Sequence, residues 1–265
     1  MQTPIVVMGA AGRMGSTIAR LVHEDSSLVL AGQVEHPERL SLLFAPECCR
    51  NSNDLDAVLA AIPGAVVIDF TSPESSIATA KASVRHGASH VIGTTGFTRE
   101  QQRELATLAQ ETPLFWSPNM SVGVSVLAKI LPQLVKMLGE SYDLEMVEIH
   151  HNKKKDSPSG TALRLAEGMV EARGWDLKDV ACYHREGIVG ERPQKEMGLQ
   201  TLRGGDVVGI HTAYFLGPGE RIEVTHHAHS RENFAQGSLR AAKWLATQNP
   251  GKLYSMDDMF DVPSC

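Results

Sequence analysis

Cysteine, aromatic residues and excess positive charge are all scarce in this 265-residue chain. It contains four cysteines, 5% aromatic residues, and 25 lysines and arginines against 31 acidic residues, for a net charge of −6. The cysteines form no CxxC pair and show no zinc-ligand spacing, which argues against a structural zinc site. The acidic balance argues against a nucleic-acid-binding surface, which usually carries a basic excess.

Long apolar runs are absent as well. No run approaches the roughly 18 to 20 residues that span a bilayer. The opening MQTP leads into a strand-like run without the charged and small-residue segments of a secretory signal. We therefore expect a cytoplasmic protein with reduced thiols and no membrane partner. The length suits one large domain or two smaller ones.

Short apolar runs and helical periodicities alternate over the first 120 residues. Helical spacing follows the first strand-like run, and later helices are expected at 75–87 and 98–111, with Thr98 as an N-cap. This β-α-β alternation with short connections predicts a Rossmann-like, doubly wound parallel sheet. The expected strands are 4–8, 26–35, 65–70, 89–96 and 112–119, and the segment with Pro37, Pro46 and the paired cysteines is expected to be irregular.

The pattern changes near residue 120. A long amphipathic helix at 121–138, interrupted or kinked at Pro132, precedes a strand, a helix and a turn-rich region with a hairpin around Gly-Pro-Gly. This favours an inserted α+β domain with a mainly antiparallel sheet. The last helix, 232–248, needs a partner for its apolar face and is expected to return to the first domain. The predicted domains are 1–121 for dinucleotide binding, 122–230 for the insertion and 231–265 for the return.

A glycine-rich segment, Gly9-Ala10-Ala-Gly12-Arg13-Met14-Gly15, lies between the first predicted strand and helix. Glycines there allow a tight turn and close approach of a pyrophosphate to a helix N-terminus. Alone, this GxxGxxG variant also fits an ordinary strand–helix turn. Glu35, at the end of the second strand, stands where an acid accepts hydrogen bonds from the adenine ribose. Together these features predict nucleotide binding.

The nucleotide preference depends on the residues around Glu35. An acid there favours a free 2′-hydroxyl and hence NADH, whereas His36 and Arg39 beside it would attract a 2′-phosphate. We expect NADH or NADPH to bind, with NADH favoured. Two more strand ends, Phe70-Thr71 and Gly93-Thr94-Thr95, would let backbone approach a flat nicotinamide, although ordinary turn chemistry explains each equally well.

Residues 148–163, EIHHNKKKDSPSGTAL, concentrate candidate catalytic groups. A histidine that faces a cleft can act as a general acid, and side-chain alternation along a strand prevents His150 and His151 from facing the same cleft. Ser-Pro-Ser-Gly-Thr is expected to open a helix at about residue 160, whose N-terminus with Lys154 would attract an anion. The alternative is a solvated basic loop before a capped helix. Spacing alone does not choose between the two histidines.

A second histidine group, His226, His227 and His229, raises the question of a metal. No carboxylate or cysteine pattern completes a site, so a structural or surface role is favoured and no metal is predicted.

Several segments together resemble the dihydrodipicolinate reductase (4-hydroxy-tetrahydrodipicolinate reductase) family of the diaminopimelate route to lysine. The similarity runs nearly end to end, and its most specific block is HH-x-x-K-x-D-x-P-S-G-T. The other matching segments are VVMGAAGRMG, IDFTSPE, VIGTTGFT, SPNMSVGV, REGIVGERPQKEMGLQTLRGGDVVGIHT and GERIEVTHHA.

The resemblance implies NAD(P)H-dependent reduction of 4-hydroxy-tetrahydrodipicolinate, a small dicarboxylate, by a homotetramer in which the sheets of the second domains form the core. His150 corresponds to the general acid and Lys154 to the catalytic lysine, while His36 stands where some members carry arginine. The implied substrate contacts are His151, Ser159, Gly160 and Thr161. The expected cofactor contacts are Gly9, Ala10, Gly12, Arg13, Met14, Gly15, Glu35, His36, Phe70, Thr71, Gly93, Thr94, Thr95, Ser117, Asn119 and Met120.

Two rival functions remain open at this point. One is another oxidoreductase on the same scaffold, such as an amino-acid or semialdehyde dehydrogenase, although no acyl-forming cysteine lies near a helix start. The other is a non-catalytic NAD(H)-binding sensor, which would need neither His150 nor Lys154. A substrate panel separates the first rival, and an NADH-oxidation assay separates the second.

Overall fold

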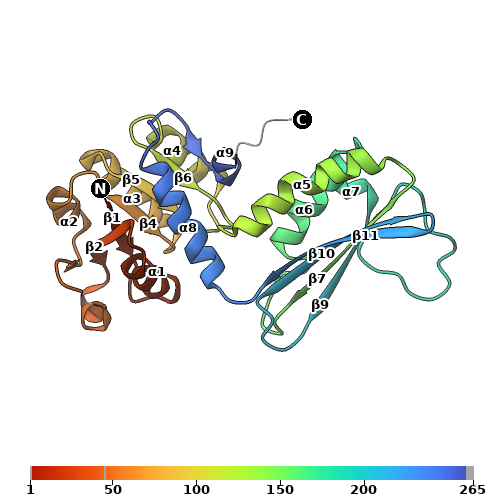
Figure 1. Cartoon of the computed structure of the whole chain (residues 1–265), viewed down its shortest axis with the longest axis horizontal. Coiled ribbons are helices and arrows are strands. Elements are labelled where there is room, and N and C mark those ends of the chain that lie inside the picture. The colour runs from red at the N-terminus through yellow and green to blue at the C-terminus, as the bar shows by residue number, and fades with distance from the viewer. Residues whose placement is uncertain (1, 45, 261–265) are drawn as a thin grey trace. The chain divides into compact units, whose positions relative to one another are not determined.

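The computed structural model describes residues 2–44 and 46–260 and divides them into two compact units. Unit 1 comprises the described residues up to Val122 together with those from Glu232 onward, and unit 2 comprises Gly123–Arg231. Figure 1 shows the elements of each unit in chain order by colour. In the described part of the chain, no helix is both long and apolar enough to cross a membrane.

Unit 1 is built on a seven-stranded sheet in which every pairing is parallel, in the order β12-β6-β5-β4-β1-β2-β3. A parallel sheet buried on both faces requires nearly continuous apolar strands, and β1 and β4 satisfy this. The predicted Rossmann-like sheet is therefore confirmed. The strands are β1 Thr3–Met8, β2 Leu28–Val34, β3 Arg50–Ser52, β4 Val66–Asp69, β5 Ser89–Ile92, β6 Leu114–Trp116 and β12 Leu253–Tyr254.

Local signals explain where the helices of unit 1 begin and end. Thr98 forms a capping box with Gln101 at the start of α4, as predicted, and Gly87 ends α3 with a left-handed φ of 60°. The last long helix, α8, contributes Ala235, Leu239 and Leu245 to the same core as α1. The helices are α1 Arg13–Glu24, α2 Leu55–Ala61, α3 Pro73–His86, α4 Arg99–Leu108, α8 Glu232–Leu245 and α9 Met256–Met259, with a 3-10 helix η1 at Pro37–Leu42.

The segment expected to be irregular is more ordered than its prolines suggested. Pro37 begins η1, and the short strand β3 pairs with β2 at the edge of the sheet. Proline suits the first position of a helix because that position needs no N–H donor. The expectation of an irregular segment was therefore wrong for η1 and β3.

Unit 2 contains a five-stranded mixed sheet in the order β11-β10-β7-β9-β8. The first three strands pair antiparallel, whereas β9 runs parallel to both β7 and β8. The strands are β7 Asp143–His150, β8 Ala181–Cys182, β9 Met197–Arg203, β10 Gly209–Gly217 and β11 Glu220–Ala228, and the helices are α5 Val122–Leu138, α6 Gly160–Glu171 and α7 Leu177–Val180.

Helices α5 and α6 lie along one side of this sheet (Figure 1). Helix α5 continues through Pro132, so the expected interruption there is absent. Strand β7 alternates strictly between buried and partly buried residues, and Leu144 and Met146 join the apolar core beneath the helices. The alternation gives the sheet one helix-covered face and one outer face.

Candidate active site

The predicted nucleotide residues of unit 1 follow neighbouring strands of its sheet. Strands β6, β5, β4, β1 and β2 are adjacent and parallel, so their carboxyl ends lie along one edge. Open α/β sheets bind ligands at this edge. Segments that begin at Ser117, Gly93, Phe70, Gly9 and Glu35 each follow one of these strands directly.

The glycine-rich loop after β1 leaves space for a ligand at the start of α1. Gly9 has a φ of 59°, and its carbonyl accepts a hydrogen bond from the Gly12 N–H at 2.9 Å. A Cβ at Gly15 would lie 2.2 Å from the Gly9 oxygen, so no other residue fits there without movement. Helix α1 starts at Arg13 with a glycine N-cap and no acid in its first turn. This loop fits a pyrophosphate.

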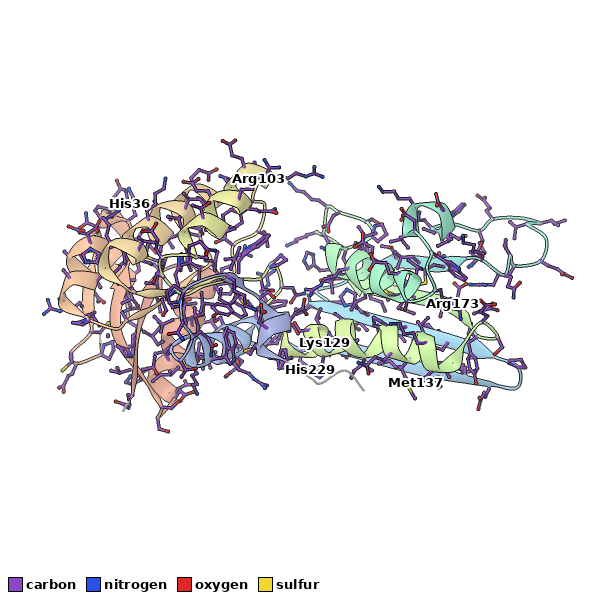
Figure 2. All side chains as sticks on the ribbon, turned by 90° about the horizontal axis from the view of Figure 1, so that it is seen from above. His36, Arg103, Lys129, Met137, Arg173 and His229 are labelled. Carbon is purple, nitrogen blue, oxygen red and sulfur yellow. The ribbon has the colours of Figure 1, made fainter. Side chains whose placement is uncertain are left out.

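Glu35 connects this loop to the end of β2. Its side chain is 8% exposed, and its carboxylate accepts hydrogen bonds from the N–H groups of Ala11 and His36 at 2.8 and 2.9 Å. Arg39 donates to the Ala11 carbonyl at 2.7 Å and lies 4.0 Å from the Glu35 carboxylate. His36 lies at the surface of unit 1 with a 65% exposed side chain (Figure 2). The acid is therefore held in place beside the loop, as a ribose-binding acid would be.

The loops after β4 and β5 are packed against each other. A Cβ on Gly93 would lie 2.2 Å from the ring of Phe70, so glycine is required for this contact. Thr71 donates from both its N–H and its hydroxyl to Asp69, at 2.8 and 2.6 Å. The first contact joins the two loops at the edge of the sheet, and the second fixes the start of the loop after β4.

Several other residues of unit 1 that are predicted to contact the cofactor have side chains that already interact within the fold. The Thr94 hydroxyl accepts a hydrogen bond from the Ser76 hydroxyl at 2.8 Å, and the Ser117 hydroxyl donates to the Asn119 carbonyl at 2.7 Å. The side chain of Met120 is buried in the core with 1% exposure, whereas Thr95 is exposed. A ligand at this edge would therefore meet the backbone of Met120 rather than its side chain.

In unit 2, the alternation along β7 places Glu148 and His150 together on the helix-covered face. Nδ1 of His150 lies 2.5 Å from the Glu148 carboxylate. Glu148 is fully buried, and His150 is 9% exposed. A Cβ at Gly209 would lie 3.0 Å from Nε2 of His150, so the glycine leaves room beside that nitrogen.

Glu148 has further donors around it. Arg203 on β9 donates to both carboxylate oxygens at 2.8 Å, and the Ser159 N–H donates at 2.9 Å. Burial raises the pKa of Glu148, but the hydrogen bonds from Arg203, His150 and Ser159 outweigh it, and the pKa lies below its ordinary value. The carboxylate is therefore ionised at neutral pH.

Burial lowers the pKa of His150, and the Glu148 carboxylate opposes this while Lys154 and Arg203 add to it. The neighbouring ring of His211 lies 5.2 Å away, edge to face. Burial lowers the pKa of His211 to about 4, so that imidazole is neutral at neutral pH. The site thus contains one histidine that can exchange a proton, His150, beside a second histidine that is neutral, His211.

Helix α6 begins at Gly160, as predicted, with Ser159 as its N-cap. The Ser159 hydroxyl accepts from the Ala162 N–H at 3.1 Å and lies 3.2 Å from Nε2 of His211. Since the Ser159 N–H is bonded to Glu148, both polar groups of this residue already have partners in the fold. Ser159 shapes the helix start, and Gly160 and Thr161 form its first turn.

The three lysines of the 153–155 run differ in their surroundings. Lys153 and Lys155 are exposed, whereas the Lys154 side chain is 20% exposed and its Nζ lies 2.9 Å from Asp156. Lys154 pairs with Asp156, whose pKa lies below its ordinary value mainly because of that lysine. Lys154 is thus the lysine of the run that is held within the site.

Sequence reasoning missed Glu148, Arg203 and His211. Glu148 could have been found, because it stands two residues before His150 and shares its face of the strand. Arg203 and His211 come from β9 and β10, and their proximity depends on a strand register that the sequence does not reveal.

Within residues 2–44 and 46–260, no group of three His, Cys, Asp or Glu side chains is placed to hold a metal ion. The rings of His227 and His229 lie 4.6 Å apart.

Comparisons with known proteins agree with this arrangement. Residues 3–120 match the family described as "Dihydrodipicolinate reductase, N-terminus", and residues 123–260 match "Dihydrodipicolinate reductase, C-terminus". A 4-hydroxy-tetrahydrodipicolinate reductase of Nitratidesulfovibrio vulgaris (strain DP4) is 68% identical over 260 residues, covering 98% of this chain and 100% of the relative. The corresponding protein of Lawsonia intracellularis is 54% identical over 259 residues, with the same coverage.

A solved structure is similar over the whole length. The dipicolinate-bound dihydrodipicolinate reductase from Paenisporosarcina sp. TG-14 has a TM-score of 0.78 at 22% identity and covers 98% of this chain and 100% of its own. At that identity the likeness supports the fold alone, whereas the two family matches and the 68% identity cover nearly every residue. The chain belongs to the dihydrodipicolinate reductase family.

Proposed function

We propose that this chain reduces 4-hydroxy-tetrahydrodipicolinate to tetrahydrodipicolinate with a reduced nicotinamide cofactor, in the diaminopimelate route to lysine. The observation that carries the proposal is the group at the end of β7. His150 is held by a buried carboxylate, has space beside Nε2, and stands next to Lys154 and the start of α6. Full-length relatives bear the name of this activity.

The residues of the site have distinct roles in this reaction. Loss of the 4-hydroxyl group as water gives a cyclic, conjugated imine acid, and a bound nicotinamide cofactor would supply the hydride that reduces it. His150 donates a proton from Nε2 to the reduced ring, a step commonly worth about 10² to 10⁴ in rate. Lys154 stabilises developing negative charge and attracts a carboxylate. Gly160 and Thr161 at the helix start, with His151, hold the substrate carboxylates.

The decisive experiment is oxidation of NADH by the purified chain with freshly prepared substrate. We expect turnover that depends on substrate and no comparable turnover with a panel of amino acids and semialdehydes. Turnover with one of those compounds instead would favour the rival dehydrogenases. Tight NADH binding with no oxidation of any substrate would favour a sensor.

We propose that either NADH or NADPH serves, with NADH favoured. The largely buried Glu35 carboxylate, held beside the glycine-rich loop by the N–H groups of Ala11 and His36, supports this preference, because an acid there would accept hydrogen bonds from ribose hydroxyls and would repel a 2′-phosphate. Arg39, about half exposed, offers that phosphate a compensating charge. Steady-state kinetics with both nucleotides test this proposal, and a thousandfold preference for NADPH would contradict it.

We also propose a homotetramer assembled through the outer face of the unit 2 sheet, acting in the cytoplasm. Leu202, Ile149 and Ile210 form a cross-strand apolar row on that face, and Leu202 is 47% exposed. An exposed apolar sheet face favours burial against another copy.

Light scattering of the purified chain tests this assembly and should give the mass of four chains. Ile149→Glu should reduce the assembly, whereas Met137→Glu should not, because Met137 is 82% exposed on α5 (Figure 2). A monomeric wild-type chain would overturn the proposal.

A further inference from the structure

We propose that Glu148 is the positioning residue for the proton donor: it sets the tautomer and orientation of His150 and ties that ring to the start of α6. This inference rests on the proposed function, since it assigns a partner to the proposed general acid.

The charge of Glu148 is buried and fully paired. The side chain is fully buried, and an isolated carboxylate there would be strongly unfavourable. Both oxygens accept from Arg203 at 2.8 Å, one lies 2.5 Å from His150, and the other accepts from the Ser159 N–H. Apolar residues of similar volume would stabilise a fold equally well, so the arrangement points to a role beyond stability.

The contact with Glu148 also determines the tautomer of His150. A carboxylate bonded to Nδ1 requires the proton of neutral His150 to be on Nδ1, which leaves Nε2 to exchange protons. Protonated His150 gives its Nε2 proton to the substrate, becomes the neutral Nδ1–H form, and recovers a proton from water, while Glu148 remains a carboxylate throughout. Gly209 keeps the space beside Nε2 clear, since a Cβ there would lie 3.0 Å from that atom.

Glu148 also offsets the positive charges around His150. The titratable or charged groups that face it are Glu148 on the same strand, Lys154 in the following loop, Arg203 on β9 and His211 on β10. Of these four, only Glu148 is negative. Lys154 and Arg203 lower the pKa of His150, as burial does, and Glu148 raises it. Without Glu148, His150 would lose its proton at a lower pH.

Glu148 and Arg203 also hold the segment that leads into α6. Arg203 also donates to the Asp156 carbonyl at 2.8 Å, and Glu148 accepts from the Ser159 N–H. The Glu148–Arg203 pair therefore holds both ends of the 156–159 segment that leads into α6. The proton donor and the helix start are bound to the same carboxylate, so their separation is kept constant.

The test compares the wild type with Glu148→Gln, which keeps the shape and removes the charge. We expect kcat/KM at neutral pH to fall at least about tenfold, and the loss of activity with rising pH to begin at a lower pH. The His150 titration, followed by NMR, should move in the same direction. NADH affinity should stay near the wild-type value.

Two further variants separate positioning from simple stability. Glu148→Asp keeps the charge and should retain a pH dependence closer to wild type, with a smaller loss of rate. Glu145→Gln, on the same strand but the opposite face, should leave the pH dependence unchanged. A Glu148→Gln enzyme that is merely less active, with unchanged pH dependence and His150 titration, would overturn the inference. A wild-type chain that oxidises no NADH would overturn the proposed function instead, and the NMR titration would still test Glu148.

Discussion

Each unit contains a buried histidine–carboxylate pair at its sheet. In unit 1, Asp69 and His90 are both fully buried, and their nearest atoms lie 3.6 Å apart, too far for a direct hydrogen bond. Neither ring nitrogen of His90 has a hydrogen-bond partner among the residues that the structure describes. In unit 2, Glu148 and His150 are in contact at 2.5 Å, and His150 keeps 9% of its surface exposed.

The difference lies in what the second ring nitrogen meets. His90 is enclosed on all sides, so no substrate can reach it. His150 is bonded to a carboxylate at Nδ1, and a glycine stands beside Nε2. A histidine–carboxylate pair is therefore suited to proton transfer only when one nitrogen is oriented and the other is accessible. The difference supports the proposed catalytic role of the pair in unit 2, whereas the pair in unit 1 is enclosed in the fold.

The largest effect is expected from His150→Gln. Turnover should fall at least about a hundredfold, because the proton donor is lost, whereas the NADH dissociation constant should change little. Stopped-flow turnover and fluorescence titration of NADH measure the two quantities. Wild-type-like turnover in this variant would contradict the role of the unit 2 pair.

Lys154→Ala should lower turnover by about a hundredfold as well, but with an opposite effect on the pH dependence from Glu148→Gln. Lys154 lowers the pKa of His150, so its removal should raise that pKa. His150 would then remain protonated to a higher pH than in the wild type. The pH dependence of the residual activity, with the NMR titration of His150, gives the sign. A shift to lower pH would show that the charge balance described for this site is incorrect.

Gly15→Ala should weaken cofactor binding by roughly tenfold or more, since the new Cβ would lie 2.2 Å from a backbone oxygen and would force the loop to move. Gly204→Ala in unit 2 is the matched control, because nothing lies within 4 Å of its Cβ position. Calorimetric titration with NADH compares the two variants. Equal affinities would contradict the assignment of the nucleotide to the loop of unit 1.

The smallest effect on turnover, less than about twofold, should come from His90→Met, because His90 is enclosed in the unit 1 sheet and its loss acts on stability rather than on proton transfer. Burial raises the pKa of Asp69, but His90 and Thr71 lower it further, so it lies below its ordinary value. The stability that follows from this lowered pKa is fully present at pH values above the ordinary pKa of an aspartate. It is lost as the pH falls through the lowered pKa of Asp69. Removing the buried His90 ring should lower the free energy of unfolding by about 1 kcal/mol at neutral pH, as is typical of a buried substitution, and by less in acid, where Asp69 is protonated.

Urea unfolding at neutral and acidic pH measures this loss of stability. His86→Met is the matched control, because His86 also contacts an aspartate, Asp56, but at the surface. An exposed pair of this kind is worth about 0–1 kcal/mol. A hundredfold loss of turnover in His90→Met would end the distinction between the two pairs.

Much of the fold followed from local patterns in the sequence. Strand and helix alternation predicted the parallel sheet, and Thr98 and Gly87 marked helix ends where the structure has them. The pairing of β9 parallel to β7 could not be predicted, since it depends on tertiary packing across more than forty residues. Short edge elements such as β12 and α9 carry too few residues for a periodic signal.

The candidate site was predicted in part. The residues at 148–163 indicated a proton donor, a cation and a helix start, but only the family resemblance distinguished His150 from His151. The structure adds that His150, not His151, ends β7 on the helix-covered face. Arg203 lay beyond prediction because it reaches Glu148 through strand pairing. The catalytic roles of His150 and Lys154 stay predictions, as do the substrate contacts of His151, Ser159, Gly160 and Thr161 and the cofactor contacts.

The division of unit 1 between the two ends of the chain bears on how the protein is made. Strand β12 completes the sheet beside β6, and α8 supplies part of the core around α1. A ribosome releases Gly123–Arg231 before these last segments, so unit 2 can finish folding while unit 1 still lacks a helix and a strand. A nascent chain that has emerged from the ribosome only as far as about residue 231 would therefore carry a complete second unit and an incomplete first unit, a state that chaperones would recognise by its exposed core.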